Sequence, residues 1–116
     1  HNEGAIAKLH IWGNTESILE GMIKTGADII DIDHLVPSLS VFSPLLSRNQ
    51  VFSGKSDPVT VIQTGSDELI RQSVVSDFKE ANGRCIVSAG CEITPETSVE
   101  KMIVFCKAAE SLWLMK

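Results

Sequence analysis

Side chains that can do chemistry follow four short apolar stretches of the sequence. A histidine lies at the end of the first stretch, acids and a histidine follow the second, a lysine and an acid follow the third, and a thiol and an acid follow the fourth. In chain order these residues are His10, Asp31, Asp33, His34, Lys55, Asp57, Cys91 and Glu92. Four of them are our catalytic candidates: Asp33, Lys55, Asp57 and Glu92.

His10 and Cys91 have the chemistry of zinc ligands. An imidazole and a thiolate that meet at one rim can hold zinc and leave a position open for a substrate thiol or water. Zinc lowers the pKa of a bound thiol and makes it a nucleophile at neutral pH. A catalytic zinc site normally has three protein ligands. The third ligand must therefore come from Glu92, Asp33, His34 or from outside this chain.

Each of these residues also has a purely structural interpretation. His10 could be a core histidine bonded to a carbonyl group, and Cys91 could be an inert cysteine. Asp31 and Asp33 could cap a helix or accept backbone amides, and Lys55 could be a solvated side chain. The recurrence of such residues at four strand ends, rather than any single one, supports the site hypothesis.

The stretches that carry these residues alternate with helical patterns. Strands are predicted at Ile6–Trp12, Ala27–Ile32, Gln50–Ser53 and Arg84–Ala89. Helices are predicted around Ile18–Ile23, from Pro37 to Ser47, from Ser66 to Asn82 and from Thr97 onward. Pro44 lies inside the second of these helices and should kink or shorten it. The last helix opens with Thr97-Ser98-Val99-Glu100, which fits a capping box.

Four strand–helix units in succession predict an α/β fold with a parallel sheet. The strands are short and almost continuously apolar, as expected when both faces of a sheet are covered. Open sheets and closed barrels share this pattern. In both, ligands bind outside the carboxyl ends of the strands, which is where the chemically capable residues gather.

Composition narrows the range of functions. The chain has 116 residues, a net charge of -5, 43% hydrophobic and 22% charged residues, which is typical of one globular domain. The negative charge argues against a nucleic-acid surface, and the apolar runs are too short to span a membrane. Three cysteines without a framework spacing indicate reduced thiols and a cytoplasmic protein. Because the sequence begins His1-Asn2-Glu3, we expect a processed N-terminus or part of a longer chain.

Four segments together resemble a known family. They read LHIWGN from residue 9, GADIIDID from residue 26, SGKSDPVTVIQTGSDELIRQSV from residue 53 and CIVSAGCEITPETSVEKM from residue 85. Their order and spacing resemble the C-terminal half of the uroporphyrinogen decarboxylase superfamily, whose fold is a (β/α)8 TIM barrel. The resemblance implies that residues 1–116 form one C-terminal half-barrel, the last four strand–helix units.

The resemblance implies one of two chemistries. One branch of the superfamily moves methyl groups between corrinoid proteins and thiols with zinc, and the other decarboxylates porphyrinogens in porphyrin biosynthesis. The methyltransferases carry a His-x-Cys pair and a later Gly-Cys as zinc ligands, and His10 and Cys91 match the first and last of these. Trp12 replaces the middle cysteine. The resemblance implies a methyltransferase-type chain with zinc as the candidate cofactor and a small-molecule substrate.

Departures from the family pattern leave two alternatives open. Lys55 replaces the asparagine of the family's Gly-Asn-x-Asp-Pro segment, and Gly90-Cys91-Glu92 differs from the Gly-His-Gly loop of the decarboxylases. The arginines and the aspartate with which decarboxylases hold and protonate their substrate belong to the other half of the barrel. The chain could therefore be a porphyrinogen decarboxylase or a non-catalytic fragment that keeps only the scaffold.

Four strand–helix units cannot close an eight-stranded barrel, and an open half leaves two sheet edges unpaired. We therefore expect association with a second half-barrel or self-association. Methyl transfer from a corrinoid would also require a corrinoid protein that docks at the barrel mouth. The isolated chain is expected to be inactive.

Overall fold

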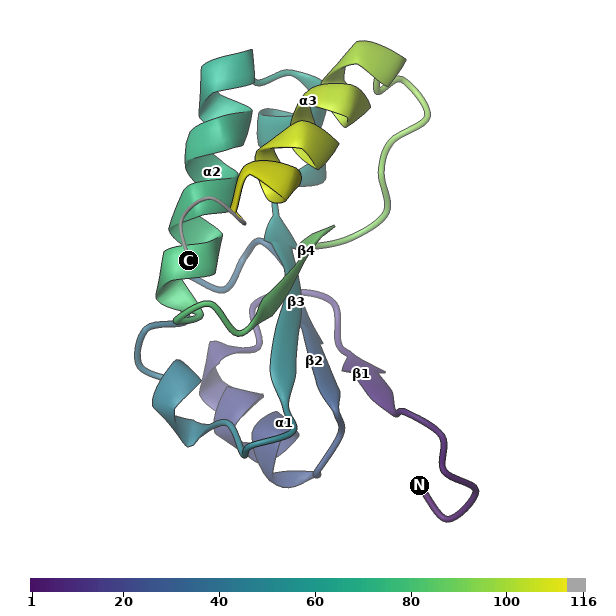
Figure 1. Ribbon diagram of the computed structural model, residues 1–116, viewed down its shortest axis with the longest axis vertical. Helices are drawn as coiled ribbons and strands as arrows, with labels where there is room; N and C mark the ends of the chain where they lie inside the picture. Colours follow the sequence, from purple (N-terminus) through teal and green to yellow (C-terminus); the bar gives the residue numbers. More distant parts are fainter. Residues whose placement is uncertain (113–116) are drawn as a thin grey trace.

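The computed structural model describes residues 1–112 and has an α/β architecture (Figure 1). Four strands form one parallel sheet in the order β1-β2-β3-β4. Their bounds are Lys8–His10 for β1, Ile29–Ile32 for β2, Val51–Ser56 for β3 and Cys85–Ala89 for β4. The helices are α1 (Leu19–Lys24), α2 (Asp67–Glu80), α3 (Val99–Ser111) and a π-helix, Pro58–Gln63, while Glu16–Ile18 and Ser43–Leu45 form 3-10 turns. The predicted succession of parallel strands and helices is confirmed.

The sheet has one covered face and one open face. Ile30 of β2 and Phe52 of β3 are fully buried in a core cluster that includes the apolar side of α1. The next residues, Asp31 and Ser53, alternate to the other face, as successive residues of a strand do. On that open face Ile86 of β4 is 49% exposed. The sheet is therefore half covered, as expected for part of a barrel whose interior is not closed.

A second core cluster packs between the π-helix, α2 and α3, beside the carboxyl end of β4 (Figure 1). Ile70 and Val74 of α2 lie four residues apart, on one side of the helix, and both are fully buried. Phe105 of α3 belongs to the same cluster, and Ala89 of β4 packs against it. This cluster ties the last strand to the two long helices and so supports the strand ends.

The helix predicted from Pro37 to Ser47 is wrong, because only the 3-10 turn Ser43–Leu45 forms there. The Ser38 hydroxyl accepts from the Ser40 amide at 3.2 Å, a local bond that competes with helical hydrogen bonding. The ring of Pro44 further disfavours a helix interior. The apolar side chains of the segment still reach the core: Val36, Leu39 and Leu46.

Strand β3 is longer than predicted and ends at Ser56 instead of Ser53. Gly54 and Lys55 have φ angles of 88° and 80°, in the left-handed region that side chains disfavour. A Cβ atom at Gly54 would collide with the carbonyl oxygen of Ile32, so only glycine permits this close approach of the two strands. We call these two residues the left-handed kink of β3.

Serine side chains fix the starts of the two long helices. The Ser66 hydroxyl accepts from the Leu69 amide at 3.0 Å, and the Ser98 hydroxyl accepts from the Lys101 amide at 3.2 Å. The predicted capping box is wrong, because Ser98 caps α3 with Lys101, not a glutamate, at the third helical position.

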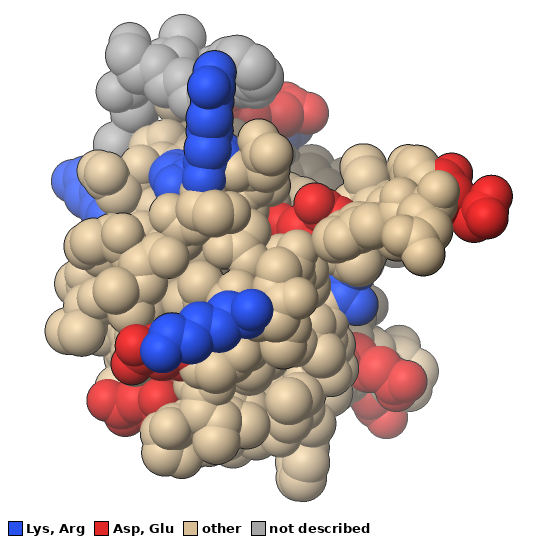
Figure 2. Space-filling view, turned by 90° about the horizontal axis from the view of Figure 1, so that it is seen from below, with Lys and Arg blue, Asp and Glu red and all other residues tan. Residues whose placement is uncertain are grey.

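Two observations concern the molecule as a whole. Among residues 1–112, no helix combines the length and the hydrophobicity that crossing a membrane requires. On the face shown in Figure 2, basic and acidic side chains are scattered among uncharged residues.

Candidate active site at the carboxyl ends of the strands

Three side chains form a polar row across the open face of the sheet, which we call the inner row: His10, Asp31 and Ser53. The strand register pairs His10 with Asp31 and Asp31 with Ser53, so the three side chains share one face. The Ser53 hydroxyl donates to Asp31 Oδ1, and Lys8 Nζ lies 3.8 Å from the same oxygen. Asp31 is only 7% exposed. These neighbours hold a nearly buried carboxylate in one position.

The Asp31 carboxylate lies beside one ring nitrogen of the His10 imidazole. Nδ1 of His10 lies 2.8 Å from Asp31 Oδ2, which leaves Nε2 available for another contact. A carboxylate at one ring nitrogen prepares a histidine to bind a metal or exchange a proton through the other. The imidazole is 37% exposed, so His10 is not the buried core histidine of the structural interpretation.

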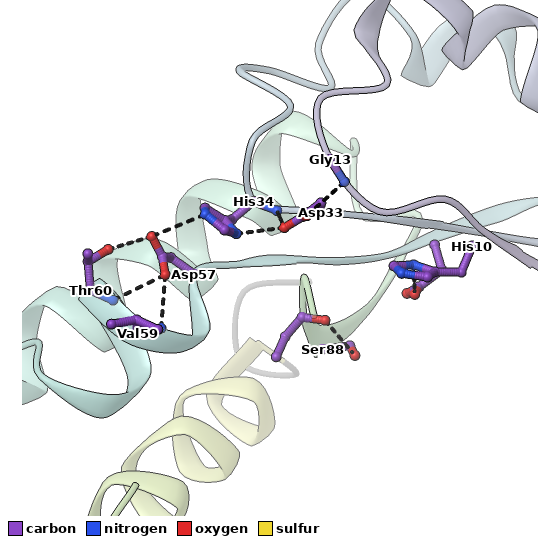
Figure 3. Close-up of polar contacts among 10 residues, drawn as sticks. His10, Gly13, Asp33, His34, Asp57, Val59, Thr60 and Ser88 are labelled. Atoms are coloured by element: carbon purple, nitrogen blue, oxygen red, sulfur yellow. Dashed lines mark hydrogen bonds and ion pairs between the residues drawn. The ribbon is translucent and has the colours of Figure 1, made fainter. Parts of the chain in front are cut away.

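A second polar group, which we call the rim cluster, consists of Asp33, His34 and Asp57 (Figure 3). His34 Nδ1 lies 2.6 Å from Asp33 Oδ1, and His34 Nε2 lies 3.6 Å from Asp57 Oδ2. The Nδ1 contact lacks hydrogen-bond geometry and is electrostatic. One imidazole therefore lies between carboxylates that follow two neighbouring strands.

Asp33 is fully buried, and backbone amides occupy both of its oxygens. Oδ2 accepts from the Gly13 amide at 2.9 Å, and Oδ1 accepts from the His34 amide at 2.7 Å. The first bond ties the loop after β1 to the end of β2. These contacts favour a structural role for Asp33, which holds the two loops together at the rim.

Asp57 caps the π-helix and remains partly accessible. Its Oδ1 accepts from the amides of Val59 and Thr60 at 2.9 and 3.1 Å, and its Oδ2 accepts from the Thr60 hydroxyl at 2.6 Å. Partial burial raises the pKa of Asp57, but the bonds from Thr60 and Val59, together with His34, outweigh burial and lower the pKa below its ordinary value. The carboxylate is therefore charged at neutral pH.

The Lys55 side chain lies away from the rim, although its sequence position suggested a catalytic role. Lys55 Nζ lies 3.5 Å from Asp77 Oδ1 and 3.3 Å from Glu80 Oε2, both on α2. The next residue faces the same helix, because the Ser56 hydroxyl donates to Asp77 Oδ2 at 3.1 Å. Burial raises the pKa of Asp77 even though Lys55 acts in the opposite direction. The structure thus brings Lys55 to the covered face of the sheet.

Cys91 and Glu92 follow β4 at the same end of the sheet. The Gly90 amide donates to the Ser56 carbonyl at 2.8 Å, and a Cβ atom at Gly90 would collide with the backbone nitrogen of His34. The segment after β4 therefore lies directly against the turn that carries His34. Cys91 is half-buried there, and Glu92 is exposed.

The other two cysteines lie elsewhere. Cys106 is exposed on α3. Burial raises the pKa of the Cys85 thiol to about 11, and the charge of Asp77 adds to the effect. Of the three thiols, Cys91 is the one at the strand ends.

The zinc ligand set expected from the sequence, which includes His10 and Cys91, is not assembled within the described residues. Within residues 1–112, no group of three or more His, Cys, Asp or Glu side chains is arranged to hold a metal ion. Trp12, at the position of the family's middle cysteine, is 71% exposed and offers no zinc donor. Asp33 is fully buried with both oxygens bonded to backbone amides, so Glu92, His34 or a group from outside this chain is left as the third ligand.

The partners of His10 in the inner row do not follow from the sequence pattern alone. The pattern marks Asp31 only as a general candidate and Ser53 as the end of a strand. The alternation of apolar and polar residues along β2 could have identified Asp31. Polar Asp31 lies between Ile30 and Ile32, so it must face away from the apolar core.

Four parallel strands alternating with helices, with polar side chains at the carboxyl ends of the strands, are typical of (β/α)8-barrel proteins. A family model described as Uroporphyrinogen decarboxylase (URO-D) matches residues 1–112. The chain therefore belongs to the uroporphyrinogen decarboxylase family, as the four sequence segments had indicated.

Relatives with two different names match the chain. It is 34% identical over 105 residues to uroporphyrinogen decarboxylase from Prochlorococcus marinus, covering 90% of this chain and 29% of that protein. It is 30% identical over 102 residues to methylcobamide:CoM methyltransferase MtbA from Methanosarcina acetivorans, covering 85% of this chain and 29% of that protein. The chain thus spans less than a third of the length of these relatives.

A solved barrel structure supports the fold. A methyltransferase from Methanosarcina mazei matches with a TM-score of 0.78 and 21% sequence identity, over 95% of this chain and 32% of that one. The four parallel strands and their helices therefore correspond to a part of a TIM barrel.

Proposed function

We propose that this chain supplies the C-terminal half of a barrel that transfers a methyl group to a thiol, with His10 and Cys91 among its zinc ligands. The proposal is carried by the contact of His10 Nδ1 with Asp31 Oδ2 at 2.8 Å. This contact leaves Nε2 available, as a metal-binding histidine requires. Zinc held there would supply a deprotonated substrate thiol. The third ligand would be Glu92, His34 or a group from the remainder of the barrel.

The name of one group of relatives supports this chemistry. MtbA is, by its name, a methyltransferase that acts on a methylcobamide and CoM. For the present chain we infer a corrinoid protein as methyl donor, docked at the carboxyl ends of the strands, and a small thiol as acceptor.

Porphyrinogen decarboxylation is the second candidate, and the 34% identity to a decarboxylase favours it. The charges at the strand ends argue against it. Asp57 and Glu92 are acidic, while Lys55 is paired with two carboxylates on the covered face. A substrate that carries several carboxylates would have to find its cations in the rest of the barrel.

The proposal includes a partner that closes the sheet. Strands β1 and β4 lie at the two ends of the four-stranded sheet, and the open face is partly apolar at Ile86. A second half-barrel, from the same polypeptide or from another copy, would cover both edges and the open face. The free thiols of Cys85, Cys91 and Cys106 favour a reducing, cytoplasmic location for this assembly.

The test is the zinc content of the purified chain, measured beside two cysteine variants. We expect near-stoichiometric zinc in the unmodified chain and in Cys106→Ser, whose thiol is exposed on α3. Cys91→Ser should lose the metal. Absence of zinc in all three proteins, or equal zinc in all three, would contradict the proposal and leave decarboxylation or a non-catalytic scaffold.

A further inference from the structure

The left-handed kink of β3 contains a strained residue next to the site. Within residues 1–112, Lys55 and Asn82 are the non-glycine residues with positive φ. Asn82 follows the end of α2, where asparagine commonly adopts this conformation. A lysine in this conformation inside a strand is uncommon, and such strain persists only when surrounding contacts hold it.

Contacts with α2 hold the strained residue. The ammonium group of Lys55 lies 3.5 Å from Asp77 Oδ1 and 3.3 Å from Glu80 Oε2. The three side chains are only 12%, 14% and 22% exposed, so solvent and salt screen these ion pairs weakly. The bond from Ser56 to Asp77 at 3.1 Å anchors the next residue to the same helix.

The kink also changes the face of the sheet on which the Lys55 side chain lies. Ser53 faces the open side, so alternation would bring residue 55 to that side as well. There it would stand beside Ser88, its partner in the register with β4. The lysine lies on the opposite face, and the Gly90 amide bonds to the carbonyl of Ser56, the residue after the kink. The Gly90 backbone lies so close to the turn at His34 that a Cβ atom would collide with the His34 nitrogen.

We propose that Lys55 is a positioning residue that acts from the covered face of the sheet. Its pairing with Asp77 and Glu80 holds the left-handed kink, and the kink lets the segment Gly90–Cys91 close onto the turn at His34. Lys55 thereby sets the place of Cys91 without contacting a substrate. The inference depends on the geometry of the metal-free chain, so it can stand or fall independently of the proposed methyl transfer.

The test is an NMR measurement on the metal-free 116-residue chain. The probe is the nuclear Overhauser effect between the Hα protons of Gly90 and the amide proton of His34, which reports the close approach directly. In Lys55→Met the strain remains but the ion pairs are lost, so this signal should disappear. Lys55→Arg keeps the charge and should keep the signal.

The Lys55→Gly variant distinguishes the backbone strain at residue 55 from the anchoring of the lysine side chain to α2. Glycine adopts positive φ without strain and has no side chain to displace, so the Gly90–His34 signal should persist although both ion pairs are gone. Lys79→Met, an exposed change on the same helix, is the control and should leave the signal unchanged.

A double variant, Asp77→Asn with Glu80→Gln, removes the ion pairs from the helix side and should lose the signal as Lys55→Met does. This double variant tests the proposal if Lys55→Met does not fold. Retention of the signal in a folded Lys55→Met or in the double variant would overturn the inference. Loss of the signal in Lys55→Gly would also overturn it, because the lysine side chain would then have another role.

Discussion

Asp31 lies next to one of the two ring nitrogens of His10 and leaves the other one free of this contact. Its Oδ2 contacts Nδ1 of the imidazole at 2.8 Å, and its Oδ1 is held by the Ser53 hydroxyl. Lys8 adds a weaker contact from the same strand as His10. A nearly buried carboxylate beside one ring nitrogen favours a proton on that nitrogen and metal binding through the other.

Asp31→Asn should therefore weaken zinc binding by about tenfold to a hundredfold, the usual effect of removing a carboxylate behind a metal-binding histidine. Competition with a chromophoric chelator measures this affinity. Asp67→Asn, at an exposed aspartate in the first turn of α2, is the matched control and should bind zinc like the unmodified chain. Equal affinities for Asp31→Asn and the control would exclude Asp31 as the orienting group.

Asp57 should make stability depend on pH in the acid range. Its pKa in the folded chain lies below the ordinary value of 3.8, so the unfolded chain binds the proton more readily. The resulting stabilisation is present above that value and is lost as the pH falls through the folded-state pKa. In urea titrations below about pH 4, Asp57→Asn should therefore lose less unfolding free energy with falling pH than the unmodified chain does. An equally steep loss of unfolding free energy in the variant and in the unmodified chain would contradict the lowered pKa of Asp57.

Cys85 should be the slowest of the three cysteines to react with an alkylating reagent. With a pKa of about 11, only about one thiol in a thousand is ionised near pH 8, and the thiolate is the reactive form. Peptide mapping by mass spectrometry after timed labelling measures each site separately. The exposed Cys106 serves as the internal reference. Labelling of Cys85 as fast as that of Cys106 would show that the thiol is not desolvated.

At the scale of elements, the end of β4 depends on one glycine. Gly90 has no room for a Cβ atom beside His34, and its amide bonds to the end of β3. Its φ angle is not among the positive ones, so the restriction is steric. This junction is what brings the segment with Cys91 against the turn after β2.

Gly90→Ala should lower the free energy of unfolding by about 1–3 kcal/mol, the range for overpacking a close contact. Gly21→Ala is the matched comparison, since Gly21 lies in α1 with open space around it. That change should raise the unfolding free energy by about 0.5–1 kcal/mol through helix propensity. Urea denaturation gives both values. Equal effects of the two substitutions would mean that the β4 junction is not tightly packed.

The elements also show where sequence reasoning succeeds and where it fails. The four strands were predictable because each is a short apolar run, and a segment with helical periodicity separates it from the next one. The segment after β2 was misread because its apolar spacing fits a helix, while its serines and Pro44 favour local turns.

The direction of Lys55 could not be predicted from the sequence. The alternation rule brings this residue to the open face, and the two positive φ angles of the left-handed kink reverse that outcome. The positions of Asp33, His34 and Asp57 were easier to foresee, since each directly follows a strand. Their hydrogen bonds to loop amides were not foreseeable, because they depend on how the loops fold back.

At the scale of the whole molecule, the fold of the chain matches part of a barrel and has an open inner face. The sheet ends at β1 and β4, and the exposed Trp12 and Ile86 lie on or next to these strands. Exposed apolar groups beside unpaired strand edges favour association. This arrangement agrees with the match to less than a third of each longer relative.

The isolated chain should therefore self-associate in sedimentation velocity experiments. Ile86→Lys introduces a charge on the open face and should shift the distribution toward the monomer without reducing the helical content. Ile103→Lys, on the exposed side of α3, is the control and should leave the distribution unchanged. A stable, well-folded monomer of the unmodified chain would contradict this expectation.

The central claim, that His10 and Cys91 belong to a thiol-activating metal site, is tested most directly by cobalt substitution. Cobalt(II) reports its ligands by absorption, because a bound thiolate produces a charge-transfer band in the near ultraviolet and tetrahedral geometry produces intense visible bands. We expect both features in the unmodified chain and in Cys106→Ser, loss of the charge-transfer band in Cys91→Ser, and weaker cobalt binding in His10→Ala. A charge-transfer band that persists in Cys91→Ser, or no cobalt binding by the unmodified chain, would contradict it.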